Sequence, residues 1–219
     1  MKRFTAIAII YFTVQISALA QSGWFWQNPL PTGNVLNSVN FANSSTGWAV
    51  GAGGTILRTT NGGTNWTTQT SGTINELYSV DFSDNNTGWA VGAGGTIIMT
   101  TNGGTNWNPQ SNGTTIYLLS VEFADNNIGW TVGRGGRIFK TTNGGTNWTI
   151  QINGTNSYFK SVYFTDNNTG WTVGSPGILK TTNGGLNWST QTGASNGLTS
   201  VYFTDSNTGW AVGFFGGIV

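Results

Sequence analysis

Short runs that alternate apolar and polar residues fill most of the chain, and turns rich in glycine and asparagine separate them. One stretch shows the pattern clearly: residues 79–82, 88–92 and 96–100 each read as a strand with apolar side chains on one face. A fourth strand begins at Trp107, after an Asn-Gly-Gly turn in which glycine permits a positive φ. No segment has a helical period with caps, so the pattern predicts almost no helix.

This four-strand unit recurs along the chain. The segment Gly-Trp-(Ala/Thr)-Val-Gly occurs five times at spacings of 41, 41, 41 and 39 residues, beginning at Gly47, Gly88, Gly129, Gly170 and Gly209. A period near 41 residues is typical of propeller blades built from four strands. The sequence therefore predicts an all-β fold, a β-propeller with about five four-stranded blades, four complete and one split or truncated. Tryptophans at the same place in every repeat are expected to fill the gaps between blades.

The two ends of the repeat region leave the number of blades open. A fourth-strand candidate near Trp24 precedes the first full period, and the last period stops two residues into its third strand, at Val219. If the Trp24 strand joins this last piece, five blades close into a ring without open sheet edges. We favour the alternative, in which the chain is a fragment of a larger propeller.

The first twenty residues are predicted to be a signal peptide, which leaves residues 21–219 as the propeller domain. Lys2 and Arg3 form a positive start, residues 4–16 are mostly apolar, and Ala18-Leu19-Ala20 is a small-x-small cleavage signature. The apolar run is short of the roughly 20 residues that span a bilayer. We therefore expect export to the periplasm, the cell surface or the medium, with no membrane span after cleavage.

Composition excludes several kinds of function. The chain has no cysteine and no histidine, so a disulfide framework, a Cys/His zinc site and Ser-His-Asp or Cys-His catalysis are excluded. A formal net charge of +1 provides no basic patch for nucleic acid. Only 7% of residues are charged, against about 25% in an ordinary soluble domain, while 13% are aromatic, which predicts a packed core.

The turn after each third strand carries a recognisable motif. Thr59-Thr60-Asn61-Gly62-Gly63-Thr64-Asn65-Trp66 resembles the Asp-box of bacterial neuraminidase repeats. Together with Gly-Trp-Ala-Val-Gly and Gly-Thr-Ile-Leu-Arg-Thr-Thr, it resembles the repeats of the photosystem II assembly and stability factor family over essentially all of residues 21–219. The resemblance implies a β-propeller in which the Asp-box is a folding motif without chemistry. Asparagine stands where that family usually has aspartate, and it can still accept backbone N–H groups. The implied structural positions are Asn61, Gly63, Trp66, Asn102, Gly104, Trp107, Asn143, Gly145, Trp148, Asn183, Gly185 and Trp188.

The two rims of the predicted propeller differ in how much they vary between repeats. The Asp-Asn-Asn turns and the Asn-Gly-Gly turns barely vary, and they share one rim because first and third strands run the same way. The turns after the second strand and the connections between blades form the other rim, and they vary strongly. Repeats diverge where shared packing does not constrain them, so this variable rim is the predicted binding face. Its candidate residues are Arg134, Arg137, Tyr117, Tyr158 and Phe214, with neutral loop residues as the alternative.

Enzymatic function is the least favoured class. A sialidase needs three clustered arginines, and the mature chain has only Arg58, Arg134 and Arg137. A glycosidase needs two carboxylates about 5–10 Å apart. Asp81 and Glu122, at equivalent first-strand positions of adjacent blades near the central channel, are the only plausible pair. Each Asp-Asn-Asn turn offers one carboxylate, whereas calcium prefers several close together. We therefore predict no catalytic residue, no metal site and no cofactor.

The sequence thus predicts an exported, monomeric, non-catalytic propeller that binds a protein partner as an interaction, assembly or stability scaffold. The alternative is recognition of a cell-surface glycan through Tyr117, Tyr158, Trp26 and rim amides. Glycoside hydrolysis of the sialidase or xyloglucanase kind is a third, less favoured function.

Overall fold

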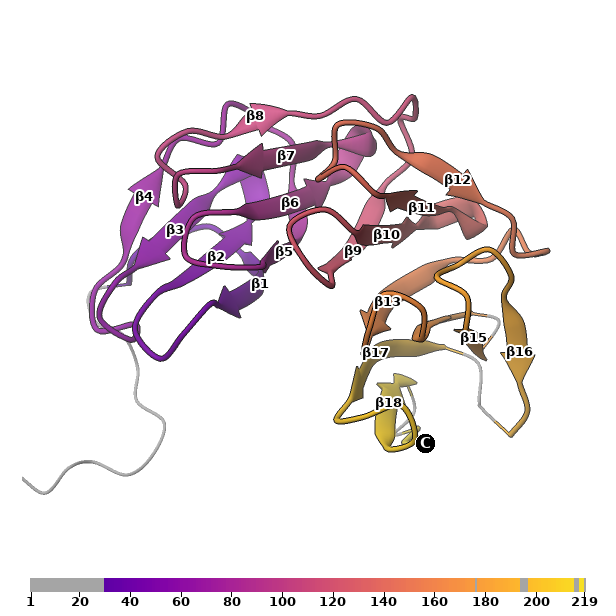
Figure 1. Ribbon diagram of the computed structural model, residues 1–219. Helices are drawn as coiled ribbons and strands as arrows, with labels where there is room; N and C mark the ends of the chain where they lie inside the picture. Colours follow the sequence, from indigo (N-terminus) through magenta and orange to yellow (C-terminus); the bar gives the residue numbers. More distant parts are fainter. Residues whose placement is uncertain (1–29, 176, 194–196, 215–216, 219) are drawn as a thin grey trace, which may run out of the picture.

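The structure is a computed structural model that describes residues 30–175, 177–193, 197–214 and 217–218. Four antiparallel sheets of four strands and one of two strands follow one another along the chain (Figure 1). This confirms the predicted all-β fold, with four complete blades and one partial one. The predicted signal peptide and the strand predicted near Trp24 lie outside the described residues, so both stay predictions.

Within every sheet the strands lie in chain order, and each pairs antiparallel with the next. The first sheet holds β1 (Leu36–Phe41), β2 (Gly47–Gly51), β3 (Ile56–Thr59) and β4 (Thr67–Gln69). The second holds β5 (Leu77–Phe82), β6 (Gly88–Gly92), β7 (Ile97–Thr100) and β8 (Asn108–Pro109). The third holds β9 (Leu118–Phe123), β10 (Gly129–Gly133), β11 (Ile138–Thr141) and β12 (Thr149–Gln151). The fourth holds β13 (Phe159–Phe164), β14 (Gly170–Gly174), β15 (Gly177–Thr181) and β16 (Ser189–Gln191), and the fifth holds β17 (Leu198–Phe203) and β18 (Gly209–Gly213).

Among the described residues, helix occurs only as short 3-10 turns after the second strand of a sheet. These turns include η1 (Ala52–Gly54), η2 (Ala93–Gly95) and η3 (Arg134–Gly136), and the prediction of almost no helix holds across the described part of the chain. In that same part, no helix has the length and apolar character needed to cross a bilayer.

The sheets are arranged as an open arc (Figure 1). The first strands β1, β5, β9, β13 and β17 contact one another in chain order along the inner side. At the two ends, side chains that are buried in the middle sheets lie open: Phe41 is 42% exposed, whereas its equivalent Phe82 is 7% exposed. Trp210 is 50% exposed, whereas Trp130 is fully buried. The described residues therefore form part of a propeller ring, and a closed five-blade ring is not seen among them.

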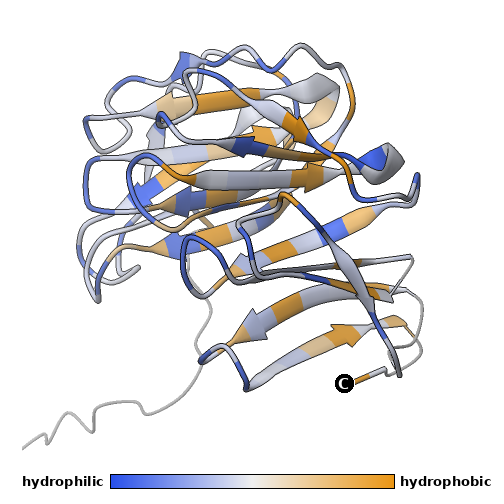
Figure 2. Cartoon of the chain, turned by 45° about the vertical axis from the view of Figure 1, so that its right-hand side comes forward, coloured by the Kyte–Doolittle hydropathy of each residue, from blue (hydrophilic) through white to orange (hydrophobic). Residues whose placement is uncertain are grey.

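The hydrophobic core lies between sheets. Each of four clusters combines second- and third-strand side chains of one sheet with first-strand side chains of the next. Figure 2 shows the apolar positions recurring along the strands, while the turns that connect them are hydrophilic. A single sheet cannot bury its own faces, so each blade depends on its neighbours for stability.

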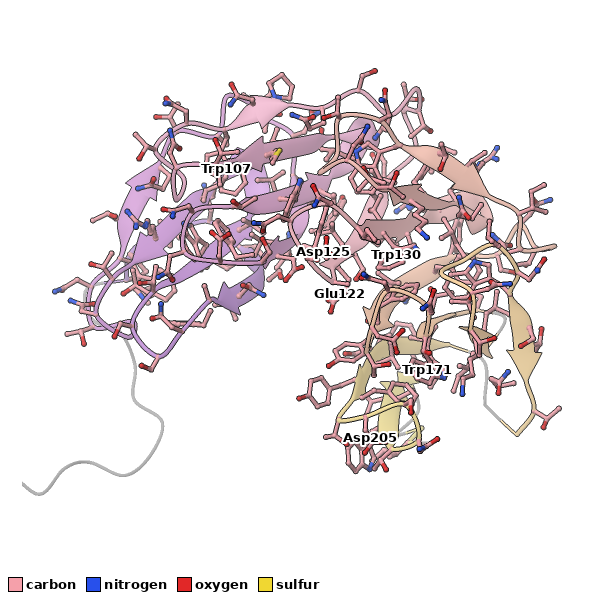
Figure 3. The ribbon with its side chains drawn as sticks, in the orientation of Figure 1. Trp107, Glu122, Asp125, Trp130, Trp171 and Asp205 are labelled. Carbon is pink, nitrogen blue, oxygen red and sulfur yellow. The ribbon has the colours of Figure 1, made fainter. Side chains whose placement is uncertain are left out.

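In the first four Gly-Trp-x-Val-Gly segments the tryptophan lies in an interface between blades, stacked on a phenylalanine of the next sheet, as the sequence predicted. The Trp130 ring stacks on Phe164 of the next sheet, with centroids 3.4 Å apart and planes 6° from parallel. Its Nε1 donates to the carbonyl of Gly184, in the Asn-Gly-Gly turn of that sheet, at 3.1 Å. Figure 3 labels Trp130 and Trp171, which occupy successive interfaces. Stacked aromatic pairs of this kind add about 0.5–1.5 kcal/mol to the area that they bury.

The Asp-box turns are closed by hydrogen bonds from threonine and asparagine. Thr100 Oγ1 accepts from the N–H of Gly104 at 2.9 Å and donates to Asn102 Oδ1 at 3.0 Å. Asn102 Oδ1 also accepts from the N–H of Asn106 at 2.9 Å. Equivalent bonds are made by Asn61, Asn143 and Asn183. Asparagine therefore supplies the acceptor that these turns need.

The two glycines in each Asp-box turn have different constraints. Gly103 and Gly104 both have positive φ, 66° and 90°, which L side chains rarely adopt. A Cβ on Gly104 would also lie 3.1 Å from Trp48 Nε1 of the preceding sheet. The turn therefore needs glycine both for its backbone and for the close approach of the neighbouring blade.

Candidate functional site

On the rim that barely varies between repeats, the aspartates of the turns after the first strands accept hydrogen bonds from backbone N–H groups of their own turns. Asp125 Oδ1 accepts from the N–H groups of Asn127 and Ile128 at 2.7 and 2.8 Å, and these bonds lower the pKa of its carboxyl group. Its second oxygen accepts from Asn167 of the next sheet at 3.3 Å. Figure 3 shows Asp125 and Asp205 well apart, at turns of different sheets. No group of three acidic, histidine or cysteine side chains able to hold a metal is found among the described residues.

The acid pair considered for hydrolysis lies at the inner side of the arc. Asp81 on β5 accepts from Asn40 Nδ2 of the first sheet at 2.9 Å and from the N–H of Phe123 of the third sheet at 2.7 Å. Its carboxyl group therefore links three consecutive blades. Glu122 stands at the same register position on β9, opposite Trp130 as Asp81 stands opposite Trp89. Figure 3 shows Glu122 on the inner edge of the arc.

Burial controls the ionisation of this pair. Burial raises the pKa of Asp81 to about 6, against the opposing effect of the hydrogen bonds from Phe123, Phe82 and Asn40. Burial, and then the charge of Asp81, raise the pKa of Glu122 well above its ordinary value. Both carboxyl groups thus hold protons more tightly in the folded state than in the unfolded chain.

This tighter proton binding makes stability depend on pH. The contribution of this pair to stability is greatest below the ordinary carboxyl pKa and falls as the pH rises from about 4 to about 6 and above, because the folded state must then give up protons that these two groups bind preferentially. We expect Glu122→Gln to raise the free energy of unfolding at neutral pH by about 1–2 kcal/mol and to flatten this decline. Thermal unfolding measured across pH tests this, with Glu76→Gln on the rim as control. An unchanged pH profile in Glu122→Gln contradicts the assignment.

Three of the residues predicted for the variable rim come together around one guanidinium group. Arg134, at the start of η3, lies with its guanidinium carbon 4.4 Å from the centre of the Tyr117 ring and 5.8 Å from that of Tyr158. The backbone places Arg134 beside Tyr117, because the N–H of Arg134 donates to the Tyr117 carbonyl at 3.0 Å. Gly133 makes this approach possible, since a Cβ there would lie 2.0 Å from that carbonyl oxygen.

Two further contacts lie on the same rim, on either side of the Arg134 group. Lys160 on β13 places its Nζ 4.2 Å from the centre of the ring of Phe214, which directly follows β18 of the fifth sheet. On the other side, the Tyr78 ring lies 6.1 Å from that of Tyr117. We call the set of Tyr78, Tyr117, Arg134, Tyr158, Lys160 and Phe214 the aromatic–cation cluster.

Two members of the cluster, Tyr78 and Lys160, were missed as candidates. They occupy the same repeat position, directly before the serine of each Ser-Val-x-Phe segment, where the other sheets have Asn37, Leu119 and Thr199. That variability was the available signal. Tyr78 also donates from its hydroxyl to Glu76 Oε2 at 3.2 Å, and burial together with the Glu76 charge raises the pKa of Tyr78.

Arg137 does not join the cluster. It is exposed and lines two hollows, one with Trp148 and Asn112 and the other with Ile152. The structure therefore separates two arginines that stand only three residues apart in sequence. Phe214, by contrast, lies in the cluster through its contact with Lys160 and is 57% exposed.

Similarity to solved structures supports the propeller architecture. A structure of an ancestral GH74 enzyme matches with a TM-score of 0.71 at 20% identity, over 88% of this chain but only 29% of the enzyme. The WD40 β-propeller domain of Doa1 matches with a TM-score of 0.64 at 13% identity, over 83% of this chain and 62% of that one. YCF48 bound to D1 peptide matches with a TM-score of 0.51 at 18% identity, over 86% of this chain and 93% of that chain. At these identities the similarity concerns the fold alone.

The sequence itself identifies the family. No curated protein matches the chain. The family described as photosynthesis system II assembly factor YCF48 matches in three overlapping segments, residues 16–112, 69–149 and 109–198, which together span most of the chain. With the Asp-box turns and the radial blades seen in the structure, this match confirms the resemblance of the repeats: the chain belongs to the YCF48 repeat family.

Proposed function

We propose that this protein is an exported, non-catalytic binding protein that holds a peptide segment of a protein partner on the aromatic–cation cluster. The observation that carries the proposal is the position of Arg134 between Tyr117 and Tyr158, on the rim that varies most between repeats. In the first and second sheets the same turn position is alanine, at Ala52 and Ala93. Among the five repeats, arginine therefore occupies this turn position only in the third.

The chemistry of the cluster suits a peptide. Tyrosine and arginine are enriched where protein interfaces carry most of their binding energy. Tyr117, Tyr158 and Phe214 are 36%, 50% and 57% exposed, so part of each side chain is open to a partner. Rings held by neighbouring cations lose little conformational freedom on binding, which favours affinity.

The family match supports this mode of action. One protein of the YCF48 name has been solved with D1 peptide bound. We extend to this chain the binding of a peptide segment, and we leave the photosystem partner with that protein. Export is supported by the amino-terminal sequence, in which a basic start, an apolar run and Ala18-Leu19-Ala20 have the order of a signal peptide.

A hydrolase function, as in the GH74 enzymes that share the fold, has less support. Each oxygen of the Asp81 carboxylate accepts a hydrogen bond from a neighbouring blade, at 2.9 and 2.7 Å. A carboxylate held in this way joins the blades and is poorly placed to act as a nucleophile or base. The other acids of the repeated turns cap their own loops.

Glycan binding is the second candidate, because exposed tyrosines can stack on sugar rings. Arg134 already lies over Tyr117, which reduces the ring face left for a sugar. The test that separates the two classes applies the purified protein to a displayed library of short peptides and, in parallel, to an array of glycans. We expect selective retention of a peptide subset. Retention on glycans alone would overturn the proposal.

A further inference from the structure

We propose that Asn112 and Asn153, in the connections between blades, are sites of spontaneous deamidation, whereas the fold protects the Asn-Gly steps of the four Asp-box turns. All six asparagines precede a glycine, the sequence context in which this reaction meets least steric resistance. Sequence alone therefore gives them equal reactivity. The structure separates them into two classes. A seventh Asn-Gly step begins at Asn196, which lies outside the described residues.

The reaction needs a free backbone nitrogen. The amide nitrogen of the glycine loses its proton to water or hydroxide and attacks Cγ of the asparagine side chain. A C–N bond forms, the bond from Cγ to Nδ2 breaks, and ammonia leaves with the proton that it needs. Water then opens the resulting succinimide ring at one of its two carbonyls, which gives aspartate or isoaspartate. The net change is asparagine plus water to an acid plus ammonia.

In the Asp-box turns the N–H of this glycine already donates a hydrogen bond to a backbone carbonyl. The N–H of Gly103 donates to the carbonyl of Asn86 at 2.8 Å, and the N–H of Gly144 donates to that of Asn127 at 2.9 Å. The same bond is made by Gly62 and by Gly184, each to the turn after the first strand of its own sheet. Attack therefore requires opening of the turn.

In the connections, the nitrogen is free. Gly113 and Gly154 are exposed, and among the described residues neither N–H has an acceptor. Asn112 Oδ1 accepts from the N–H of Thr114 at 3.0 Å, and Asn153 Oδ1 accepts from that of Thr155 at 3.1 Å. This bond spans the glycine, so it keeps the side-chain carbonyl folded toward the glycine nitrogen and withdraws electrons from the carbon that is attacked.

The product would change the variable rim. Asn153 Nδ2 donates to the carbonyl of Gly136 at 2.6 Å, and Asn112 Nδ2 donates to that of Gly95 at 2.7 Å. Deamidation replaces each donor by a carboxylate oxygen that faces a carbonyl oxygen, so the bond is lost and repulsion takes its place. Gly136 ends η3, the turn that begins with Arg134. Conversion at Asn153 therefore loosens the support of the aromatic–cation cluster.

The first sheet provides a natural control. Ser71 takes the place of these asparagines there, and its hydroxyl donates to the carbonyl of Thr73 at 3.0 Å and accepts from the N–H of the same residue at 3.3 Å. Serine closes this connection without a reactive amide. Asn153→Ser thus removes the reactive group and keeps a side chain that the repeat already tolerates.

The experiment incubates the folded, full chain in mildly alkaline buffer made with ¹⁸O-water and follows each Asn-Gly peptide by digestion and mass spectrometry. The heavy oxygen marks conversion that occurs during incubation. We expect Asn112 and Asn153 to convert at least about ten-fold faster than the four Asp-box asparagines, the factor that corresponds to ~1.4 kcal/mol for opening one hydrogen bond. In denaturant the six rates should become similar, and Asn153→Ser should abolish only its own signal.

Two results overturn the proposal. Equal rates at all six steps in the folded chain would mean that the hydrogen bonds of the Asp-box glycines give no protection. Persistence of the difference in denaturant would assign it to local sequence rather than to the fold. Neither result depends on whether a peptide binds the cluster, so the proposed function is tested separately.

Discussion

Replacing Trp130 by alanine is expected to lower the free energy of unfolding by about 3–5 kcal/mol, the usual cost of truncating a buried aromatic side chain. Trp130 is fully buried, stacks on Phe164 and donates to the carbonyl of Gly184. The substitution removes both contacts and leaves a cavity between two blades. Most domains are stable by only about 5–15 kcal/mol, so this single change takes a large share. Chemical denaturation measures it.

The repeat offers a matched control for this prediction. Trp210 occupies the same position in the fifth sheet, is 50% exposed and has no following sheet against it among the described residues. Trp210→Ala is expected to cost less than about 1 kcal/mol, because little area is lost from the core. Equal losses for the two variants would show that tryptophan stabilises its own sheet and not the interface between blades.

The second large effect concerns binding. Arg134→Glu is expected to weaken the affinity for a peptide partner by at least about 30-fold, or roughly 2 kcal/mol, as charge reversal at the centre of an interface does. The guanidinium of Arg134 contacts the rings of Tyr117 and Tyr158, so its loss removes a cation and frees the two rings that it orders. Titration of a peptide selected on the wild-type protein measures the change.

Arg137→Glu provides the comparison. Arg137 directly follows η3, the turn that begins with Arg134, is exposed and lies outside the cluster. The two variants have the same net charge, so a general electrostatic effect would weaken both. We expect the Arg137 variant to keep wild-type affinity within about two-fold, since rim charges contribute little. Similar losses of affinity in both variants would show that the peptide does not bind at the cluster.

Most of the fold could be predicted from the period of the sequence. The five copies of Gly-Trp-x-Val-Gly determine where second strands lie, and the Asn-Gly-Gly turns determine where third strands end. The role of Trp130 was also predictable, because a residue that recurs in every repeat serves what every repeat shares. The curvature of the arc was not, since it depends on small rotations between sheets that no single repeat encodes.

The site was only partly predictable. Variation between repeats identified Tyr117, Arg134 and Tyr158, but it identified Arg137 equally, and only the structure separates them. Contacts between side chains of different blades decide which of these candidates come together. Lys160 meets Phe214 from the next sheet, and Asp81 is enclosed by the sheets on both sides. Such contacts join residues 41 to 54 positions apart, and they depend on how the sheets are assembled.

The most direct test of the central claim, that a protein partner is held on the variable rim, is site-specific photocrosslinking in the cells that make the protein. A photoreactive phenylalanine analogue is placed at Tyr117 and, in a second strain, at Thr60 in an Asp-box turn on the opposite rim, where the side chain is exposed. We predict a discrete crosslinked protein from position 117 and none from position 60. Crosslinking from position 60 alone would contradict the account.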